Sequence, residues 1–377
     1  MTATKAYVLQ ELNAPFKLED VELDEPEENE VLVEITAVGL CHTDLCVQNG
    51  AFPSPFPSVV GHEGSGIVQK CGSAVTRCKE GDSVLLSFNH CSSCGPCKMN
   101  EPSACENFGA SNFGRVRSQK LGAKPGIKRG NGDEIYGNFF GQSAFAQHAV
   151  VNENSVVKVP SDTDLVGLAP LGCGLMTGAG AILNLLKPAK TSSVSIFGLG
   201  AVGCGALFAA KHSGVETIIV VDLVGDKLAL AKELGATHTI NARDPEIVQK
   251  IKALTKYNMG ATYSVEASGN VKALMTAWES LANKGHLVSV GTPGPGTPIP
   301  FCIFENLLGS KTYTGLTEGG SNPPEFIPYL LKLHSEGHFP VEKISKTFAM
   351  DKLDDAVHAM HTGETIKPII VFKDPKK

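Results

Sequence analysis

The sequence lacks the features of a secreted, membrane-spanning or nucleic-acid-binding protein. Its first twenty residues, MTATKAYVLQELNAPFKLED, contain no apolar core of a secretory signal. Two stretches without charge, 165–186 and 191–210, approach the length of a membrane span, but several glycines interrupt each of them. A formal net charge of −6 leaves no broad basic face for phosphate backbones. We therefore expect a cytoplasmic protein with no nucleic-acid or membrane partner.

Length and composition indicate a globular protein of about two domains. The chain has 377 residues, of which 42% are hydrophobic and 19% charged, an ordinary balance for a protein with real cores. Its eleven cysteines are an odd number, which fits thiols and metal ligands better than a framework of disulfides.

The period of the apolar residues changes along the chain. Residues 6–40 alternate apolar and polar positions, as antiparallel strands do, and short strands with Gly/Pro-rich turns continue to about 175. From there to about 310, apolar strands alternate with helical stretches, which predicts a parallel sheet with crossover helices. The expected strands include 194–197, 217–222, 263–265 and 287–290, and the expected helices include 226–235 and 270–284.

The predicted fold class is α/β, with a doubly wound parallel-sheet domain inserted into a β-rich one. Short strands and one or two helices return after residue 311, so both flanks of the insertion should form one domain. We expect this domain to comprise 1–174 and 311–377, and the inserted domain to comprise 175–310.

Four cysteines crowd one loop, in the run Cys91-Ser-Ser-Cys94-Gly-Pro-Cys97 followed by Cys105. Thiolates this close repel one another unless a cation neutralises them, and four sulfurs match tetrahedral Zn²⁺. Disulfides are the alternative, but nothing in the sequence indicates an oxidising compartment. Because a closed four-sulfur site leaves no position for substrate, we expect a structural zinc lobe over about 88–110.

A glycine-rich turn follows the buried strand that begins at residue 194. Gly198, Gly200 and Gly203 form a Gly-x-Gly-x-x-Gly pattern that allows a tight turn, close approach of a pyrophosphate and close packing of the next helix. The following strand ends in Asp222, whose carboxylate would accept from a ribose 2′-hydroxyl and repel a 2′-phosphate. The pattern therefore predicts a dinucleotide site that prefers NAD to NADP.

A second set of metal-ligand residues, Cys41, His62 and Cys173, is spread along the chain. Each residue alone is equally explained by core packing. Together they supply two thiolates and one imidazole, which leaves tetrahedral Zn²⁺ a fourth position for water or substrate.

In these motifs the sequence resembles the zinc-dependent medium-chain alcohol dehydrogenases, and most closely their aryl- and benzyl-alcohol branch. The run from Gly61 to Gly66, the cysteine lobe, the segment around Cys173 and the glycine turn occur in the family's order. The resemblance implies a GroES-like catalytic domain and a Rossmann domain with substrate in the cleft between them. It also implies two Zn²⁺ per chain, with Glu63 able to approach the catalytic ion and Asp44 hydrogen-bonded to His62.

The expected reaction is oxidation of a primary alcohol to its aldehyde, and the reverse, by hydride transfer from a zinc-bound alkoxide to nicotinamide. In the family a hydroxyl at the position of Thr43 passes the alcohol's proton toward the cofactor ribose. Many relatives have a histidine where this chain has Cys46, and a thiol is a poorer base near pH 7. We therefore expect the proton to leave by water.

The resemblance also implies a set of cofactor contacts. Thr177 and Val202 would flank the nicotinamide, Lys227 would reach the adenosine ribose, and His42 and Lys367 would lie near the pyrophosphate. Further contacts are expected at Val290 and Leu316.

Aromatic residues suggest the class of alcohol. By position, Phe88, Phe139, Phe140 and Thr292 are candidates to line the pocket, although core packing explains each phenylalanine equally well. Aromatic walls would suit a bulky or aromatic alcohol. One alternative substrate is S-(hydroxymethyl)glutathione. The branch that uses it has an arginine just past the last structural cysteine, whereas here Cys105 is followed by Glu-Asn-Phe-Gly, and Arg115 and Arg117 lie farther along.

Two other functions compete with this interpretation. A zinc-free enoyl or quinone reductase of the same superfamily would not need all three catalytic ligands, and a non-catalytic relic would tend to lose them. Relatives form dimers or tetramers through the Rossmann sheet, so we expect a homodimer or homotetramer, with 287–303 as a candidate edge.

Overall fold

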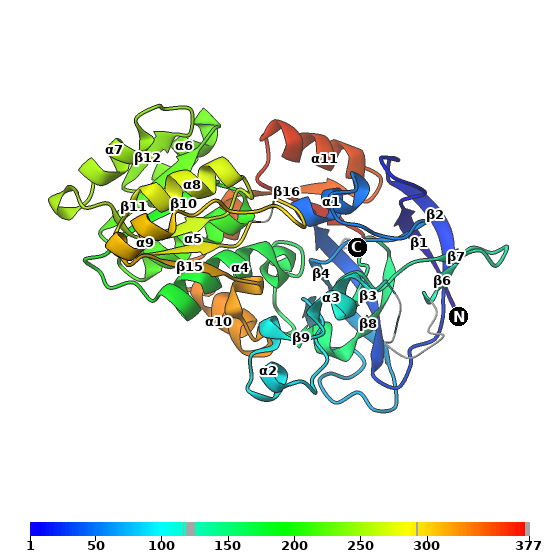
Figure 1. Cartoon of the computed structure of the whole chain (residues 1–377). Coiled ribbons are helices and arrows are strands. Elements are labelled where there is room, and N and C mark those ends of the chain that lie inside the picture. The colour runs from blue at the N-terminus through cyan, green and yellow to red at the C-terminus, as the bar shows by residue number, and fades with distance from the viewer. Residues whose placement is uncertain (116, 118–124, 292, 374–377) are drawn as a thin grey trace. The chain divides into compact units, whose positions relative to one another are not determined.

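The computed structural model describes residues 1–115, 117, 125–291 and 293–373 (Figure 1), so the predicted pocket residue Thr292 lies outside the described residues. The chain forms two compact units. The first comprises Met1–Cys173, Asn322–Leu330 and Val341–Lys377, and the second comprises Gly174–Ser321 and Leu331–Pro340. The second unit is thus inserted into the first, as the change of apolar period predicted.

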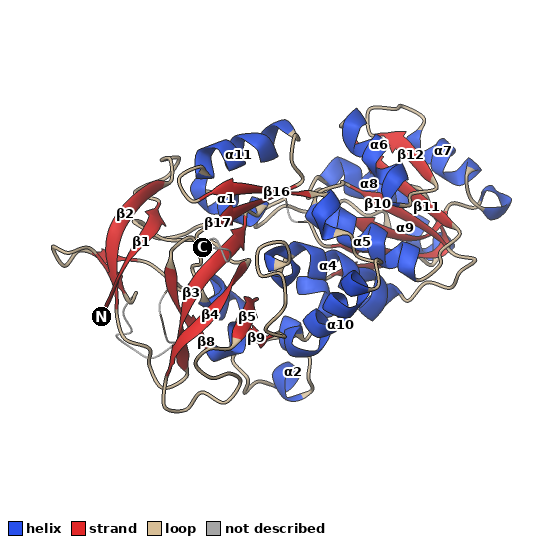
Figure 2. Ribbon diagram, turned by 180° about the vertical axis from the view of Figure 1, so that it is seen from behind, coloured by secondary structure: helices blue, strands red, loops and turns tan. Residues whose placement is uncertain are grey.

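The first unit is built on two sheets. Its larger sheet has the strand order β16-β17-β3-β4-β5-β9, with β8 paired to β3, and its smaller sheet has the order β1-β2-β6-β7. Figure 2 shows β3, β4 and β17 side by side. The strands are β1 (Thr2–Val8), β2 (Lys17–Leu23), β3 (Glu30–Gly39), β4 (Gly64–Cys71), β5 (Ser83–Leu86), β6 (Ile127–Lys128), β7 (Glu134–Ile135), β8 (His148–Asn152), β9 (Val156–Lys158), β16 (Ser345–Ala349) and β17 (Lys367–Val371).

Strand β3 is more deeply buried than its alternating sequence suggests. Val31, Val33 and Ile35 are fully buried as expected, but Glu30 and Thr36 on the other face are buried as well. The reason is that β3 is a central strand, paired with β4, β8 and β17. The carboxyl end of this central strand leads directly to Cys41 and helix α1.

Five helices accompany the sheets of the first unit or connect to it. They are α1 (His42–Gln48), α2 (Gly95–Lys98), α3 (Phe108–Phe113), α10 (Pro323–Ser335) and α11 (Leu353–Thr362). Helix α1 follows directly from β3, and its first turn carries the acidic residue Asp44. No helix in the described part of the chain is long and apolar enough to cross a bilayer.

The second unit is a doubly wound parallel sheet with the strand order β12-β11-β10-β13-β14-β15. Its first strand, β10, and its fourth, β13, lie side by side in the middle, so the chain reverses its winding direction between them. The strands are β10 (Ser193–Phe197), β11 (Thr217–Asp222), β12 (His238–Asn241), β13 (Ala261–Glu266), β14 (Leu281–Ser289) and β15 (Thr312–Gly315).

Helices of the second unit precede or connect these strands. They are α4 (Gly174–Gly180), α5 (Ala201–His212), α6 (Gly225–Leu234), α7 (Ile247–Ala253), α8 (Val271–Glu279) and α9 (Ile303–Gly309). Helix α8 begins at Asn270, whose side chain accepts from the backbone N–H groups of Lys272 and Ala273 and so caps the helix. An apolar core that includes Phe197, Ile219 and Trp278 covers one face of the sheet.

Three boundaries differ from the sequence-based expectations. The helix expected at 270–284 ends at Glu279, because the next residues pair with β13 as strand β14. The inserted unit extends past 310, because β15 pairs with β14 and completes the sheet. For the same reason 287–303 does not begin at the sheet edge: β14 is an interior strand, and β15 is the edge.

The glycine turn after β10 has the backbone geometry that its motif requires. Gly198 has φ +90°, which favours glycine. A Cβ at Gly203 would lie 1.9 Å from the carbonyl oxygen of Gly198, whereas a Cβ at Gly200 would meet no described atom within 4 Å. Gly203 therefore allows close packing of α5 on the turn, and Gly200 keeps the space above it open.

We predict that Gly203→Ala and Gly200→Ala separate these two roles. Gly203→Ala should destabilise the second unit by about 1–3 kcal/mol, because its methyl group has no space. Gly200→Ala should leave thermal stability unchanged and weaken dinucleotide binding. Thermal denaturation and cofactor titration of both variants test this, and equal stabilities would contradict the packing role of Gly203.

Candidate active site

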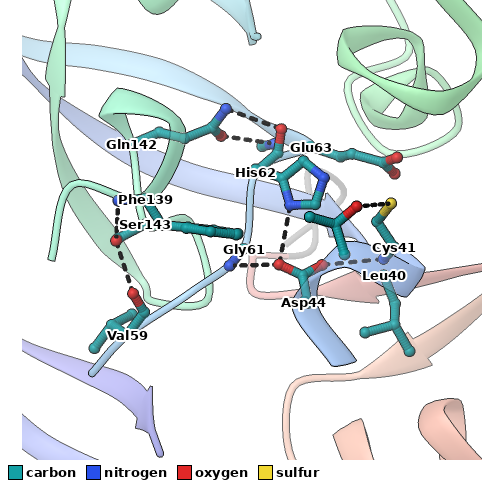
Figure 3. Close-up of polar contacts among 12 residues, drawn as sticks. Leu40, Cys41, Asp44, Val59, Gly61, His62, Glu63, Phe139, Gln142 and Ser143 are labelled. Atoms are coloured by element: carbon teal, nitrogen blue, oxygen red, sulfur yellow. Dashed lines mark hydrogen bonds and ion pairs between the residues drawn. The ribbon is translucent and has the colours of Figure 1, made fainter. Parts of the chain in front are cut away.

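A buried carboxylate organises the residues around the end of β3 (Figure 3). The Oδ2 atom of Asp44 accepts from the backbone N–H of Cys41 at 3.0 Å. Its Oδ1 atom accepts from the backbone N–H of Gly61 at 2.9 Å and from His62 Nδ1 at 3.0 Å. Asp44 and the His62 side chain are both fully buried. One side chain thus fixes two of the three segments that carry predicted metal ligands, those of Cys41 and His62.

The Asp44 contact leaves one nitrogen of His62 available to a metal. Since a carboxylate accepts, Nδ1 carries the proton, and Nε2 presents its lone pair. The Nε2 atom is buried and has no hydrogen-bond partner among the residues that the structure describes. A buried polar atom of this kind is costly unless something binds it, so the orphaned nitrogen fits a metal ion.

The predicted ligands converge on one point. Potential ligand atoms of Cys41, His62, Glu63 and Cys173 all lie within 4.8 Å of one another. A hydrogen bond with Cys173 lowers the pKa of Cys41 well below its usual range, against the opposing effect of burial. Thiolate and imidazole ligands in this number match zinc. The expected convergence of 41, 62 and 173 is therefore present in the structure.

Glu63 has a partner that the sequence analysis did not assign to it. The Nζ atom of Lys367 lies 2.9 Å and 2.8 Å from the two carboxylate oxygens of Glu63 and donates to the carbonyl oxygen of Leu40 at 3.0 Å. Both members of the ion pair are buried. Lys367 therefore neutralises Glu63 next to the metal site, while its contact with a pyrophosphate stays a prediction.

Two residues of α1 relate to the expected proton relay. The Thr43 hydroxyl lies 3.7 Å from the Cys41 sulfur, so it is adjacent to the metal site. Burial raises the pKa of Cys46, and the charges of Cys41 and Asp44 raise it further. A thiol with a raised pKa is almost entirely protonated near pH 7, so it is even less able to accept a proton there than the sequence suggested.

Phenylalanines surround the imidazole of His62, a predicted metal ligand. The His62 ring stacks on Phe140 with ring centroids 4.5 Å apart and meets the edge of Phe139 at 5.4 Å. Phe113 packs on both phenylalanines, at 5.3 Å and 6.0 Å. Phe140 has φ 54°, in the left-handed region that non-glycine residues seldom adopt. The strained backbone places its ring flat against the imidazole.

Sequence analysis missed half of this aromatic cluster. It predicted Phe88, Phe139 and Phe140, and the structure adds Phe52, Phe108 and Phe113, which are half-buried. Phe108 contacts Phe88 at 5.6 Å and Phe113 contacts Phe52 at 5.8 Å. Phe108 and Phe113 are the first and last residues of α3. Their closeness in sequence to the cysteine lobe was the one feature of the sequence that could have indicated them.

The cysteine lobe forms a second metal-binding cluster. Sulfur separations of 3.5 Å (Cys91 to Cys105), 4.0 Å (Cys91 to Cys97) and 4.0 Å (Cys94 to Cys105) are seen. A tetrahedral ion with Zn–S bonds of about 2.3 Å separates its sulfurs by about 3.8 Å, so the lobe fits zinc. All eleven cysteines lie in the described part of the chain and are free thiols, which excludes the disulfide alternative here.

Predicted cofactor residues gather at the carboxyl edge of the parallel sheet in the second unit. Asp222 ends β11, and its oxygens accept from the backbone N–H groups of Leu199 at 2.6 Å and Val224 at 2.9 Å. Val290 directly follows β14, and its N–H donates to the carbonyl oxygen of Glu266. Leu316 directly follows β15, and its N–H donates to the carbonyl oxygen of Ser289. The N-terminus of α5 has no side-chain cap among the described residues, so its N–H groups fit a pyrophosphate.

The remaining predicted contacts are distributed over both units. A Cβ at Gly178 would lie 1.8 Å from the carbonyl oxygen of Val202, so α4 and α5 pack closely and bring Thr177 near Val202. Lys227 lies in α6. Burial raises the pKa of the Cys204 thiol, and the charge of Lys227 opposes this rise. His42 is exposed at the start of α1 in the first unit, and its role at the cofactor stays a prediction.

Comparisons with known proteins agree with the two units. Residues 27–161 match the model of the alcohol dehydrogenase GroES-like domain, and residues 201–336 match the model of the zinc-binding dehydrogenase family. Geraniol dehydrogenase of Castellaniella defragrans is 39% identical over 371 residues, covering 98% of each chain. S-(hydroxymethyl)glutathione dehydrogenase of Paracoccus denitrificans is 32% identical, covering 98% of this chain and all of the relative.

A solved structure extends the similarity to three dimensions. Benzyl alcohol dehydrogenase of Acinetobacter calcoaceticus has a TM-score of 0.93 and 39% identity, covering 98% of this chain and 99% of that one. A GroES-like unit, a parallel-sheet unit and two zinc-type clusters define a zinc-binding alcohol dehydrogenase. The chain belongs to the zinc-dependent medium-chain alcohol dehydrogenase family.

We predict that Cys97→Ser removes one of two zinc ions per chain. The serine hydroxyl cannot replace a thiolate ligand, and the lobe should lose metal and stability together. The control is Cys71→Ser, because Cys71 is a half-buried thiol outside both clusters. Elemental analysis and thermal denaturation check the result; two retained ions in Cys97→Ser would contradict the assignment.

Proposed function

We propose that the protein oxidises a primary alcohol with an aromatic or otherwise bulky apolar group to its aldehyde with NAD⁺, and catalyses the reverse. The observation that carries the proposal is the phenylalanine cluster packed directly around His62. A large apolar substrate group gains more from such walls than ethanol does. Two relatives named for geraniol and benzyl alcohol are in keeping with this class.

Asp222 supports NAD⁺ rather than NADP⁺ as the cofactor. Each of its carboxylate oxygens accepts one backbone N–H, which holds the charge at the end of β11. A carboxylate there accepts from ribose hydroxyls and repels a 2′-phosphate. Comparison of NAD⁺ and NADP⁺ affinities tests this preference.

The chain's own residues have distinct tasks in this reaction. Zn²⁺ held by Cys41, His62 and Cys173 would supply a Lewis acid that lowers the pKa of the alcohol, and the nicotinamide would accept the hydride. Asp44 keeps His62 in the tautomer that presents Nε2. Lys367 compensates the Glu63 charge, and the aromatic side chains exclude water.

Thr43 is the residue we propose to take the alcohol's proton, and its neighbour Cys46 has no part in the relay. Thr43 lies beside the Cys41 sulfur, whereas Cys46 is buried and has a raised pKa. From Thr43 the proton would pass to the cofactor ribose and then to water.

The glutathione adduct is supported less well. That substrate carries carboxylates and needs a cation at its binding site. The Arg115 guanidinium is buried and donates to the carbonyl oxygen of Val59 at 2.8 Å. Arg117 is bound to the Glu30 carboxylate. Arg117 is therefore already paired, and Arg115, although its Nε and Nη1 atoms have no hydrogen-bond partner among the described residues, is 1% exposed and so closed to a substrate carboxylate.

We also propose a homo-oligomer in the cytosol. Helix α9 exposes four large apolar residues, Ile303 at 80%, Phe304 at 67%, Leu307 at 71% and Leu308 at 69%. An apolar patch of this kind next to an edge strand suits a protein interface. The reducing environment of the cytosol would keep the cysteines of both clusters as thiols that can bind zinc. Sedimentation of the purified protein tests the assembly.

We predict that Thr43→Ala lowers kcat for alcohol oxidation by about 10²–10⁴-fold, the usual contribution of a positioned proton-transfer group. Cys46→Ala is the matched variant and should change kcat less than twofold, because the buried thiol does not accept the proton. Steady-state kinetics near pH 7 measures both. A large loss in Cys46→Ala would contradict the relay described here.

We predict that Phe113→Ala lowers kcat/KM for benzyl alcohol about tenfold, because it removes part of the aromatic wall. The value for ethanol should change little, since so small a substrate does not reach the ring. The ratio of the two values is the measurement. An equal loss for both alcohols would mean that Phe113 serves the fold and does not select the substrate.

A further inference from the structure

The loop after β15 holds three consecutive residues in the left-handed region. Glu318, Gly319 and Gly320 have φ values of 49°, 65° and 59°. Two glycines adopt this conformation freely, but at Glu318 it costs about 1 kcal/mol or more. Such strain persists where surrounding contacts impose it, and it often accompanies a functional position.

Contacts with α4 and the residues after it impose this loop conformation. The side chain of Asn184 donates to the carbonyl oxygen of Gly319 at 3.0 Å and lies 3.3 Å from the Ser321 hydroxyl. A Cβ at Gly319 would lie 2.7 Å from the carbonyl oxygens of Met176 and Thr177. The loop therefore packs against the backbone of α4, and only glycine fits at 319.

The same loop brings a carboxylate to Thr177. The Thr177 hydroxyl donates to Glu318 Oε2 at 3.3 Å, and Glu318 is only 9% exposed. A carboxylate that is ionised in a buried position acts over a longer range than one in water, because the surrounding dielectric constant is low. Glu318 thus places a carboxyl group next to a residue expected to flank the nicotinamide.

Topology places Glu318 on the nicotinamide side of the cofactor site. Asp222 ends a strand of the half sheet that would hold the adenosine, so the nicotinamide would lie toward β13, β14 and β15. Leu316 follows β15 and is tied to the end of β14 through Ser289 at 3.0 Å. Glu318 comes two residues later, at the carboxyl edge of that half.

We propose that Glu318 favours the oxidised cofactor over the reduced one. This inference rests on the proposed function, since it requires a nicotinamide at this edge. The oxidised ring carries a positive charge and the reduced ring is neutral, so a nearby carboxylate stabilises NAD⁺ alone. Glu318 would thereby promote binding of NAD⁺ and departure of NADH, which suits alcohol oxidation.

The variant Glu318→Gln removes the charge and keeps an oxygen for the Thr177 hydroxyl. We expect the Kd of the purified zinc-loaded enzyme for NAD⁺ to rise about tenfold, the size of one partly screened charge interaction. The Kd values for NADH and for ADP-ribose, which lacks the nicotinamide, should stay within twofold. Isothermal titration calorimetry measures all three without turnover.

Two further variants make the result specific. Glu318→Asp keeps the charge and should restore most of the parent ratio of NAD⁺ to NADH affinity. Glu336→Gln removes an exposed carboxylate of the same unit, which pairs with Lys332, and should leave the ratio unchanged. Thermal denaturation of each variant identifies any loss of folding.

Several outcomes would overturn the inference. One is an equal change in NAD⁺ and NADH affinity in Glu318→Gln, which would indicate a role in loop shape alone. Another is a Glu318→Asp variant with the same ratio as Glu318→Gln. If the parent enzyme binds NAD⁺ and NADH no more tightly than it binds ADP-ribose, the proposed cofactor is refuted and this inference with it.

Discussion

The three hydrogen bonds accepted by the Asp44 carboxylate hold the catalytic site together. A buried carboxylate is costly unless donors satisfy it. Here the donors are the backbone N–H groups of Cys41 and Gly61 and the ring of His62. Two of these residues are predicted metal ligands, and the third precedes one. The electrostatic need of one side chain therefore sets the distance between the ligands before any metal binds.

Charge compensation around this centre extends to distant strands. Glu63 directly precedes β4, and its counter-ion Lys367 is the first residue of β17. The pair brings a second negative group close to the thiolates without leaving an unpaired buried charge. Together with the chemistry of the ligands, it explains why so polar a cluster tolerates burial beneath phenylalanines.

Short motifs made most of the site predictable, because their chemistry is local. The cysteine lobe and the glycine turn were identified from spacing and residue type, and Cys41, His62 and Cys173 from residue type together with the family resemblance; the structure brings each set together. The Glu63–Lys367 pair and the rings of Phe108 and Phe113 were not found, because their contacts depend on how α3 and β17 pack.

Fold boundaries failed where tertiary pairing overrides local preference. Residues after Glu279 include leucine, alanine and lysine, which favour helix, yet they pair with β13 as strand β14. Lys284 has φ 62° in that strand, which no propensity scale would anticipate. Likewise β15 is short and half-buried, so only its pairing with β14 shows that the inserted unit continues.

The pairing of β17 with β3 has a consequence for synthesis on the ribosome. One of the three partners of the central strand, β17, emerges only after the entire inserted unit has been made. Until then Glu63 lacks its cation, and the part of β3 that pairs with β17, residues 37–39, is open on that side. The inserted unit can fold while it is still being translated, whereas the nascent catalytic unit must wait, with its thiols unprotected, for its last strand.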